Sequence, residues 1–216
     1  MTMKEKKFEC KQCGLCCKKF EEGKKGGISI FEFERDKFMK LAEEKGIKEG
    51  IFIRRLGEQG VGVYGVRFNE GCPFLENNKC SIYNDRPFYC RTFPIHSLSI
   101  NKNNLDIIFD YLCPESKIKK RTNGKINLSE KFKELSEIYG DIFLIALEMD
   151  FINNKFIELS GKFNYNFEKP FFKQVIKNGI LDEEELKILI MEIYELKHAR
   201  VVVNELFKRE GWSLRV

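Results

Sequence analysis

The sequence predicts an α+β protein with a small, irregular, cysteine-rich first half and an α-helical second half. All eight cysteines lie in the first 113 of the 216 residues, and the rest of the chain has none. Short alternating segments, typical of strands, occupy the first half, whereas apolar residues recur at helical spacing in the second. We therefore expect two domains, at residues 1–116 and 117–216, with the second packed on the first. The basic run 117–121 and the polar residues 122–124 predict the loop between them.

The first helix is predicted from a capping box. Ser29 and Glu32 have the S-x-x-E spacing in which two side chains cap the first helical turn. Apolar residues at helical spacing follow, and we expect the helix to continue to about Lys45. Gly46 is a suitable C-terminal cap, because glycine adopts the left-handed conformation that ends many helices.

The rest of this half is expected to contain short strands and one helical turn. Residues 51–68 alternate and are rich in Val, Ile, Phe and Gly, which indicates a pair of strands. Pro87 can open a helix, so a short helical turn is expected over residues 88–91. Residues 95–100 and 105–112, joined by four polar residues, predict a hairpin.

The second half is predicted to be helical. A helix is expected over residues 129–151, and a shorter one after Pro170. Asp182 and Glu185 form a second capping box, which predicts one long helix as far as Glu210, closed by the glycine that follows. No residue in this half indicates chemistry, so it is expected to act as a helical scaffold.

Composition excludes several classes of protein. Hydrophobic residues make up 43% of the chain, including 20 Phe, which excludes a wholly disordered protein. The net charge is +5, with lysines spread among acids, so there is no strong signal for nucleic-acid binding. No apolar run approaches the roughly 18 residues of a membrane span, and no apolar segment follows the basic N-terminus as in a signal peptide. We therefore expect a cytoplasmic protein with no membrane partner, and leave open a protein partner.

The cysteines are the main functional signal. Cys10, Cys13, Cys16 and Cys17 form a C-x2-C-x2-C-C cluster, and two-residue spacers let thiolates converge on one metal centre. Eight cysteines without a secretion signal indicate metal binding more than disulfides, although inert or disulfide-bonded cysteines remain an alternative. Successive side chains diverge, so Cys16 and Cys17 either serve two centres or include one thiol that is not a ligand.

The distal cysteines complete the pattern. They are Cys72, Cys80, Cys90 and Cys113, of which the first and last precede proline. In ferredoxins, three cysteines at two-residue spacing and a distant Cys-Pro hold iron–sulfur clusters. Eight thiols would suit two four-sulfur sites, with iron–sulfur or zinc occupancy. The spacing favours a [4Fe–4S] cluster, with zinc as the alternative cofactor.

Five short motifs occur in order in this half. They are Phe8-Glu9-Cys10-x-x-Cys13-Gly14-x-Cys16-Cys17, Gly71-Cys72-Pro73-Phe74-Leu75, Cys80-Ser81-Ile82-Tyr83, Arg86-Pro87 and Cys90-Arg91-x-Phe93-Pro94. Over about residues 8–114, this pattern resembles the YkgJ-type cysteine-cluster family, described as a zinc- or iron-chelating domain and related to flagellin lysine N-methylase.

The resemblance implies a metal-binding protein and a ligand set. Seven probable ligands are implied, with Cys113 matching a more variable cysteine; the seven are Cys10, Cys13, Cys16, Cys17, Cys72, Cys80 and Cys90. The methylase relatives imply an alternative function, an S-adenosylmethionine-dependent protein lysine N-methyltransferase. A carrier of metal or clusters is a third hypothesis. Whether the protein is an enzyme is left open.

Each of the residues beside the cysteines has two possible roles. Arg86 and Arg91 either donate hydrogen bonds to thiolate or sulfide, or make ordinary carboxylate contacts. Phe74 and Phe88 either shield the site from water or simply pack in the core. No motif in the sequence separates these alternatives.

The glycine pattern and the two histidines have simpler structural explanations. Gly60-x-Gly62-x-x-Gly65 matches the glycine spacing of dinucleotide-binding turns, but the valines between the glycines favour a twisted strand. His96 is expected to be a structural histidine and His198 an exposed one. A histidine-based hydrolytic site is therefore not predicted.

Overall fold

The computed structural model has the predicted α+β fold. It describes residues 7–18, 27–47, 51–56, 60–68, 71–101, 104–110, 112–116 and 128–211, so the predicted loop at 117–124 lies outside the described residues. Backbone packing groups the chain into two compact units. We name residues 12–91 and 153–190 the thiol unit, and residues 1–11, 92–152 and 191–216 the hairpin unit. The predicted domain boundary after residue 116 stays a prediction, because these units describe packing and not independent folding.

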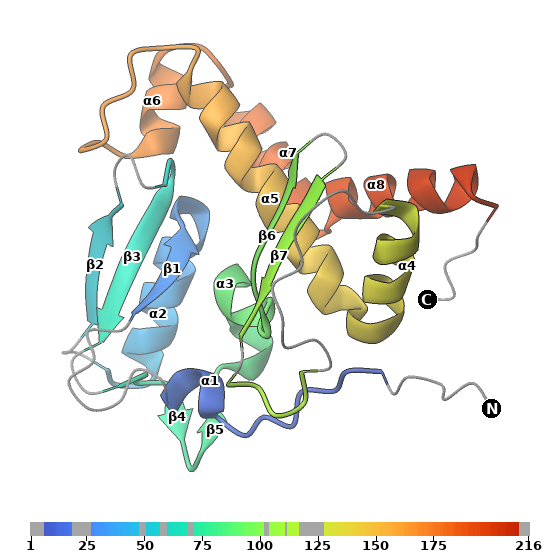
Figure 1. Cartoon of the computed structure of the whole chain (residues 1–216). Coiled ribbons are helices and arrows are strands. Elements are labelled where there is room, and N and C mark those ends of the chain that lie inside the picture. Colours follow the sequence, from blue (N-terminus) through green and yellow to red (C-terminus); the bar gives the residue numbers. More distant parts are fainter. Residues whose placement is uncertain are drawn as a thin grey trace, which may run out of the picture. The chain divides into compact units, whose positions relative to one another are not determined.

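The thiol unit is built on a three-stranded antiparallel sheet. Its strand order is β1 (Gly27–Phe31), β3 (Val63–Phe68), β2 (Ile51–Arg55), so the strand pair predicted within residues 51–68 is confirmed. Helix α2 (Arg35–Glu44) covers one face of the sheet (Figure 1). The core between them consists of apolar side chains from both elements, chiefly Ile30, Phe38, Ala42, Tyr64, Val66 and Phe68.

The predicted start of the first helix is wrong. Ser29 lies in β1, opposite Gly65 of β3, and a 3-10 turn, η1 (Glu32–Glu34), precedes α2. The alternation of β1, which buries Ile30, outweighs the local capping signal of Ser29. The predicted end is confirmed, because Gly46 has φ +69° and its N–H donates to the Glu43 carbonyl.

Short elements complete the thiol unit. A two-residue hairpin joins β4 (Leu75–Glu76) to β5 (Lys79–Cys80) through Asn77 and Asn78, both with positive φ. The remaining elements are α1 (Leu15–Lys18), η3 (Tyr83–Asp85), α3 (Phe88–Arg91) and α6 (Phe171–Lys177), with the end of α5 (Asp141–Ser160) and most of α7 (Glu183–Tyr194). The predicted turn at 88–91 and the helix after Pro170 are therefore confirmed.

The hairpin unit combines one β-hairpin with helices. Strands β6 (Ile95–Asn101) and β7 (Asn104–Phe109) form the predicted hairpin, with the second strand ending three residues before the expected Leu112. Helices α4 (Leu128–Tyr139) and α8 (Lys197–Arg209) and the first part of α5 belong to the same unit. They share a core with the hairpin that includes Leu105, Ile107, Phe132, Leu135, Phe143 and Val203.

Two predicted helices are each divided in two. Gly140, with φ +51°, ends α4 before α5 begins, so the helix expected over 129–151 is not continuous. Leu196, with φ +56°, separates α7 from α8, although the capping box at the start of α7 forms as predicted. The buried carboxylate of Glu148 accepts the Ala199 N–H at 2.8 Å and so caps α8 from another helix. A tertiary contact of this kind leaves no periodic signal in the sequence.

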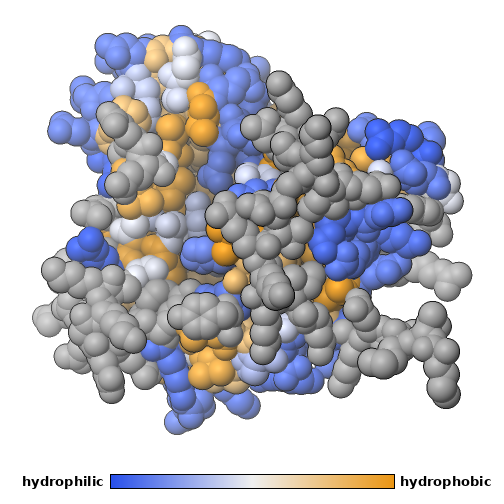
Figure 2. Space-filling view, viewed as in Figure 1, coloured by the Kyte–Doolittle hydropathy of each residue, from blue (hydrophilic) through white to orange (hydrophobic). Residues whose placement is uncertain are grey.

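In the part of the chain that the structure describes, no helix has the length and apolarity of a membrane span. Figure 2 shows, on the face viewed in Figure 1, hydrophobic surface interrupted by hydrophilic side chains. Scattered apolar residues of this kind are ordinary on a folded surface.

Candidate metal centre

Five cysteine thiols of the thiol unit interact with one another. The Sγ atoms of Cys16 and Cys17 are 4.0 Å apart. The Cys17 thiol also hydrogen-bonds to Cys72, and the charge of Cys80 acts on it. Cys90 interacts electrostatically with three members of the same set, namely Cys16, Cys17 and Cys80. We name these five residues the thiol cluster. All eight cysteines of the chain lie among the described residues, and none forms a disulfide.

Mutual proximity changes the acidity of the cluster. A hydrogen bond from Cys16 lowers the pKa of the Cys17 thiol, but the hydrogen bond with Cys72, burial, and the charges of Cys72 and Cys80 together raise it to about 12. Burial raises the pKa of Cys90, and the charges of neighbouring thiols raise it further. Several thiolates can share this space only if a cation balances their charge, as a bound metal ion does.

The first cysteine motif is held against the β4–β5 hairpin. Gly14 has φ +72°, and a Cβ at this position would lie 2.5 Å from the backbone oxygen of Asn78. The Cys17 N–H donates to the Gly14 carbonyl at 2.9 Å, which forms the turn that leads into α1. Figure 1 shows α1 beside β4 and β5. This close approach brings the thiols of α1 to Cys80 of β5.

The last cluster cysteine is placed by a buried carboxylate. Glu34, 5% exposed, accepts the Phe88 N–H at 2.8 Å and the Phe31 N–H at 3.0 Å. Phe88 is the first residue of α3, which carries Cys90, and the Cys90 N–H donates to the Pro87 carbonyl. Glu34 therefore ties the helix that carries Cys90 to the end of β1.

The two arginines beside Cys90 contact backbone and rings. Arg86 donates to the carbonyl oxygens of Tyr83 at 2.8 Å and Cys90 at 3.5 Å, and its guanidinium lies 3.8 Å from the Tyr83 ring centroid. Its positive charge lowers the pKa of the Cys90 thiol, which burial raises more strongly. Arg91 lies over the Phe88 ring at 5.1 Å. Arg86 thus acts on the Cys90 thiol through its charge, while its Nε and Nη1 donate to backbone oxygens.

A family comparison identifies this part of the chain. Residues 9–114 match the model of the CxxCxxCC family, described as "Putative zinc- or iron-chelating domain". The match covers 106 of the 216 residues, and we refer to this stretch as the CxxCxxCC domain. The resemblance seen in the sequence is thereby confirmed, and metal chelation is the function that the family description carries. No curated protein matches the chain. No solved structure matches it either.

The remaining three cysteines of the CxxCxxCC domain either are more exposed than those of the thiol cluster or belong to the hairpin unit. Cys10 and Cys13 are exposed, and Cys10 belongs to the hairpin unit. Cys113 also belongs to the hairpin unit, where it is 7% exposed in the apolar core. The structure therefore brings together five of the eight predicted ligands, and the ligand roles of Cys10, Cys13 and Cys113 stay predictions.

The thiol cluster fits a soft metal in its donor chemistry. Two thiolates on one tetrahedral zinc ion are about 3.8 Å apart, since each Zn–S bond is about 2.3 Å. The 4.0 Å between Cys16 and Cys17 is close to that separation. Within the described ranges, no three Cys, His, Asp or Glu side chains are already placed to hold a metal ion. Metal binding would therefore draw the other thiols inward.

The weaker sequence signals have structural roles. Gly60 and Gly62 precede β3 and Gly65 lies within it, so the strand favoured from the sequence holds only for the last glycine of the pattern. His96 is exposed. The expectation that His198 is exposed is wrong, because its ring stacks on Phe151 with centroids 3.7 Å apart.

The Gly14 contact gives a matched prediction for the CxxCxxCC domain. Gly14→Ala and Gly46→Ala both place a side chain at a positive φ, which costs about 1–2 kcal/mol. Only Gly14→Ala must also displace a backbone oxygen, since nothing lies within 4 Å of a Cβ at Gly46. We expect Gly14→Ala to lower both the free energy of unfolding and the metal content. Gly46→Ala should lower the free energy of unfolding and leave the metal content unchanged. Denaturation and metal analysis of the two proteins check this; equal metal content in both would contradict the docking role of Gly14.

Proposed function

We propose that the thiol cluster binds a metal ion through four of its five thiolates and that the metal organises the thiol unit. The observation that supports this is the mutual approach of Cys16, Cys17 and Cys72, where the hydrogen bond with Cys72, burial and neighbouring charge raise the pKa of the Cys17 thiol. The five thiols come from α1, a loop, β5 and α3 and are each only partly buried, as ligands contributed by separate segments would be. The ion supplies the positive charge that lets these side chains ionise together.

The spacing of the cysteines and the geometry of the thiol cluster favour different metal centres. The C-x2-C-x2-C run favours a [4Fe–4S] cluster, in which each thiolate binds a different iron. The 4.0 Å separation of Cys16 and Cys17 favours one tetrahedral ion, whose ligands lie an edge apart. We therefore propose zinc as the occupant, with the [4Fe–4S] cluster as the alternative that the experiment must separate.

A structural role follows from where the thiols lie. They are carried by α1, β5 and α3, elements of four residues or fewer, and by the loop before β4. Such short elements have little stability of their own, so metal–thiolate bonds would hold them together. The methyltransferase hypothesis rests on the resemblance alone, and no contact among the described residues favours it.

The deciding experiment is metal analysis of protein purified without oxygen. We expect a colourless protein with stoichiometric zinc and no acid-labile sulfide, because zinc has a filled d shell and no redox chemistry. Broad visible absorption that dithionite bleaches, with equimolar iron and sulfide, would replace zinc by the [4Fe–4S] cluster and keep the thiolate site. Absence of any bound metal after anaerobic purification would contradict the proposed function itself.

Metal removal gives a second, segment-resolved prediction. If the ion organises the thiol cluster, a chelator should increase hydrogen exchange in residues 71–91 and leave α4 and α8 nearly unchanged. Exchange measured by mass spectrometry on metal-loaded and chelated protein resolves these segments. Equal protection of residues 71–91 in both samples would contradict a structural role for the metal.

A further inference from the structure

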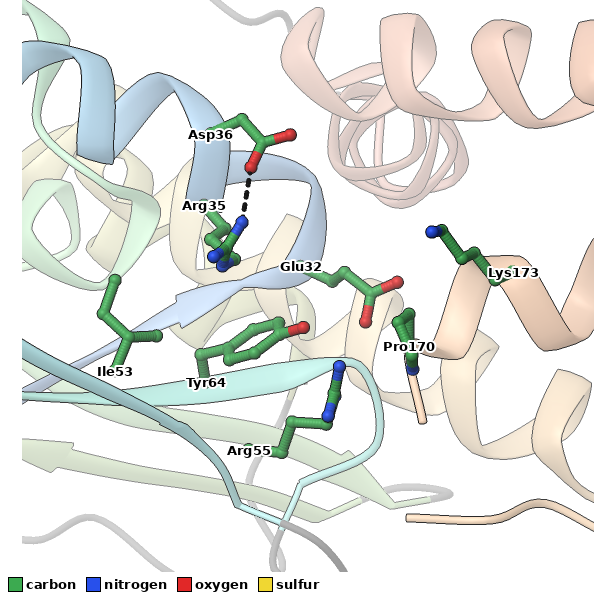
Figure 3. Close-up of a pocket in the computed structure, with 8 residues that line it drawn as sticks. All are labelled: Glu32, Arg35, Asp36, Ile53, Arg55, Tyr64, Pro170 and Lys173. Carbon is green, nitrogen blue, oxygen red and sulfur yellow. Dashed lines mark hydrogen bonds and ion pairs between the residues drawn. The ribbon is translucent and has the colours of Figure 1, made fainter. Parts of the chain in front are cut away.

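A polar pocket in the thiol unit is lined by strands β2 and β3, the η1–α2 turn and the start of α6. Its volume is about 550 Å³, which is within the range of small-molecule sites. Figure 3 shows side chains that line it from four segments, namely the η1–α2 turn, strand β2, strand β3 and the start of α6. None of its lining residues is a cysteine, so the pocket is distinct from the thiol cluster.

Both carboxylates of the pocket are already engaged. Glu32 accepts the backbone N–H groups of Phe171 at 2.8 Å and Phe172 at 2.9 Å, one with each oxygen. Asp36 accepts from Arg35 at 2.7 Å, and Figure 3 shows this pair at one edge of the pocket. Both carboxylates therefore have partners within the protein, and the three cations Arg35, Arg55 and Lys173 outnumber the two acids in the lining.

Two cations of the pocket lack anionic partners. Arg55 donates to the backbone oxygen of Glu168 and hydrogen-bonds to the Tyr64 side chain, but its buried Nε has no hydrogen-bond partner. Lys173 is exposed and forms no ion pair with any residue in the described part of the chain. A buried donor without a partner is costly, and a ligand oxygen would relieve that cost.

Tyr64 supplies a third donor next to these cations. The Arg55 guanidinium lies 5.5 Å from the centre of its ring, and Figure 3 shows its hydroxyl directed towards the space between Glu32 and Arg55. Burial, aided by the charge of Glu32, raises the pKa of Tyr64, so its hydroxyl stays protonated and able to donate. Ile53 and Pro170 add apolar wall to the same pocket.

We propose that this pocket binds a small organic anion, whose carboxylate or phosphate oxygens meet Arg55, Tyr64 and Lys173 and whose apolar body lies along Ile53 and Pro170. The planar guanidinium of Arg55 matches the oxygens of either group, and the Lys173 ammonium adds a mobile point charge. The ligand is an organic anion and not a bare ion, because the pocket is larger than a single phosphate requires and has apolar walls. The proposal does not depend on which metal the thiol cluster holds.

The test is calorimetric titration of the full-length, metal-loaded protein with four probes. These are benzoate, phenylphosphonate, inorganic phosphate and neutral benzamide. We expect one of the two organic anions to bind, more tightly than inorganic phosphate, and benzamide not to bind. Stronger binding of phenylphosphonate would assign the natural group as a phosphate, and stronger binding of benzoate would assign it as a carboxylate.

Three variants locate the binding. Arg55→Ala should weaken the preferred anion about tenfold or more, as expected for loss of a charge-assisted hydrogen bond. Lys173→Ala changes an exposed side chain and should weaken it several-fold while the unfolding curve stays unchanged. Lys177→Ala, on the same α6 helix but outside the pocket, is the matched control and should bind like the original protein. The proposal is wrong if neither organic anion binds, if benzamide binds equally well, or if Lys173→Ala behaves like Lys177→Ala.

Discussion

Replacing Cys17 with serine is expected to lower metal affinity by roughly 100-fold or more. Cys17 interacts with Cys16, Cys72 and Cys80 and affects Cys90, so it is the member that all the others share. A serine hydroxyl is a poor ligand for soft metals. If binding of the order of 10–16 kcal/mol is divided among four thiolates, the loss of one lowers affinity by roughly 100-fold or more. Metal content after dialysis against a weak chelator measures the effect.

Cys113→Ala is the matched control for this experiment. Cys113 lies in the apolar core of the hairpin unit, and alanine keeps that position apolar. We expect the variant to retain its full metal content and to lose some stability to the small cavity. The proposed ligand set would be refuted if Cys113→Ala lost the metal while Cys17→Ser kept it.

The local features of the fold were predictable where the deciding signal is itself local. The caps at Gly46 and at Asp182 with Glu185 form as the sequence indicates, because each involves residues within one turn. The helix predicted from Ser29 failed because a neighbouring strand competes for the same residues. The first turn of α8, after the break at Leu196, is capped by Glu148, which lies about fifty positions earlier in the chain and outside any local sequence window.

The candidate site was predictable in composition but not in grouping. Spacing marked all eight cysteines, yet the thiol cluster depends on the contact of Gly14 with Asn78 and on the Glu34 hydrogen bonds. The Asn77–Asn78 pair was the available signal for the β4–β5 hairpin, since asparagine tolerates positive φ in tight turns. The pocket proposed to bind an anion left no signal in the sequence, because residues 32–64 and 170–173, which line it, are more than a hundred positions apart.

Replacing Glu34 with alanine is expected to be the most damaging change outside the cysteines. Its carboxylate accepts two buried backbone N–H groups, and each donor left without a partner costs about 1–3 kcal/mol. The free energy of unfolding should therefore fall by about 3 kcal/mol at pH 6. Metal affinity should fall with it, because α3, which carries Cys90, loses its tie to β1. Glu43→Ala, on the exposed side of α2, should change neither quantity.

The loss of unfolding free energy caused by Glu34→Ala should depend on pH. Burial of Glu34 decides whether the loss is larger at low or at high pH. Burial raises the pKa of Glu34 from 4.5 to about 7, although the two N–H groups lower it. A pKa raised in the folded state means that the folded protein binds the extra proton, so this group's stabilisation is present at low pH and is lost as pH rises through 7. Glu34→Ala removes that dependence. The variant should therefore be less destabilised at pH 8 than at pH 6 when metal-loaded proteins are unfolded by denaturant. A larger loss at pH 8 would mean that the carboxylate is ionised throughout this range and that Glu34 holds α3 as a buried anion.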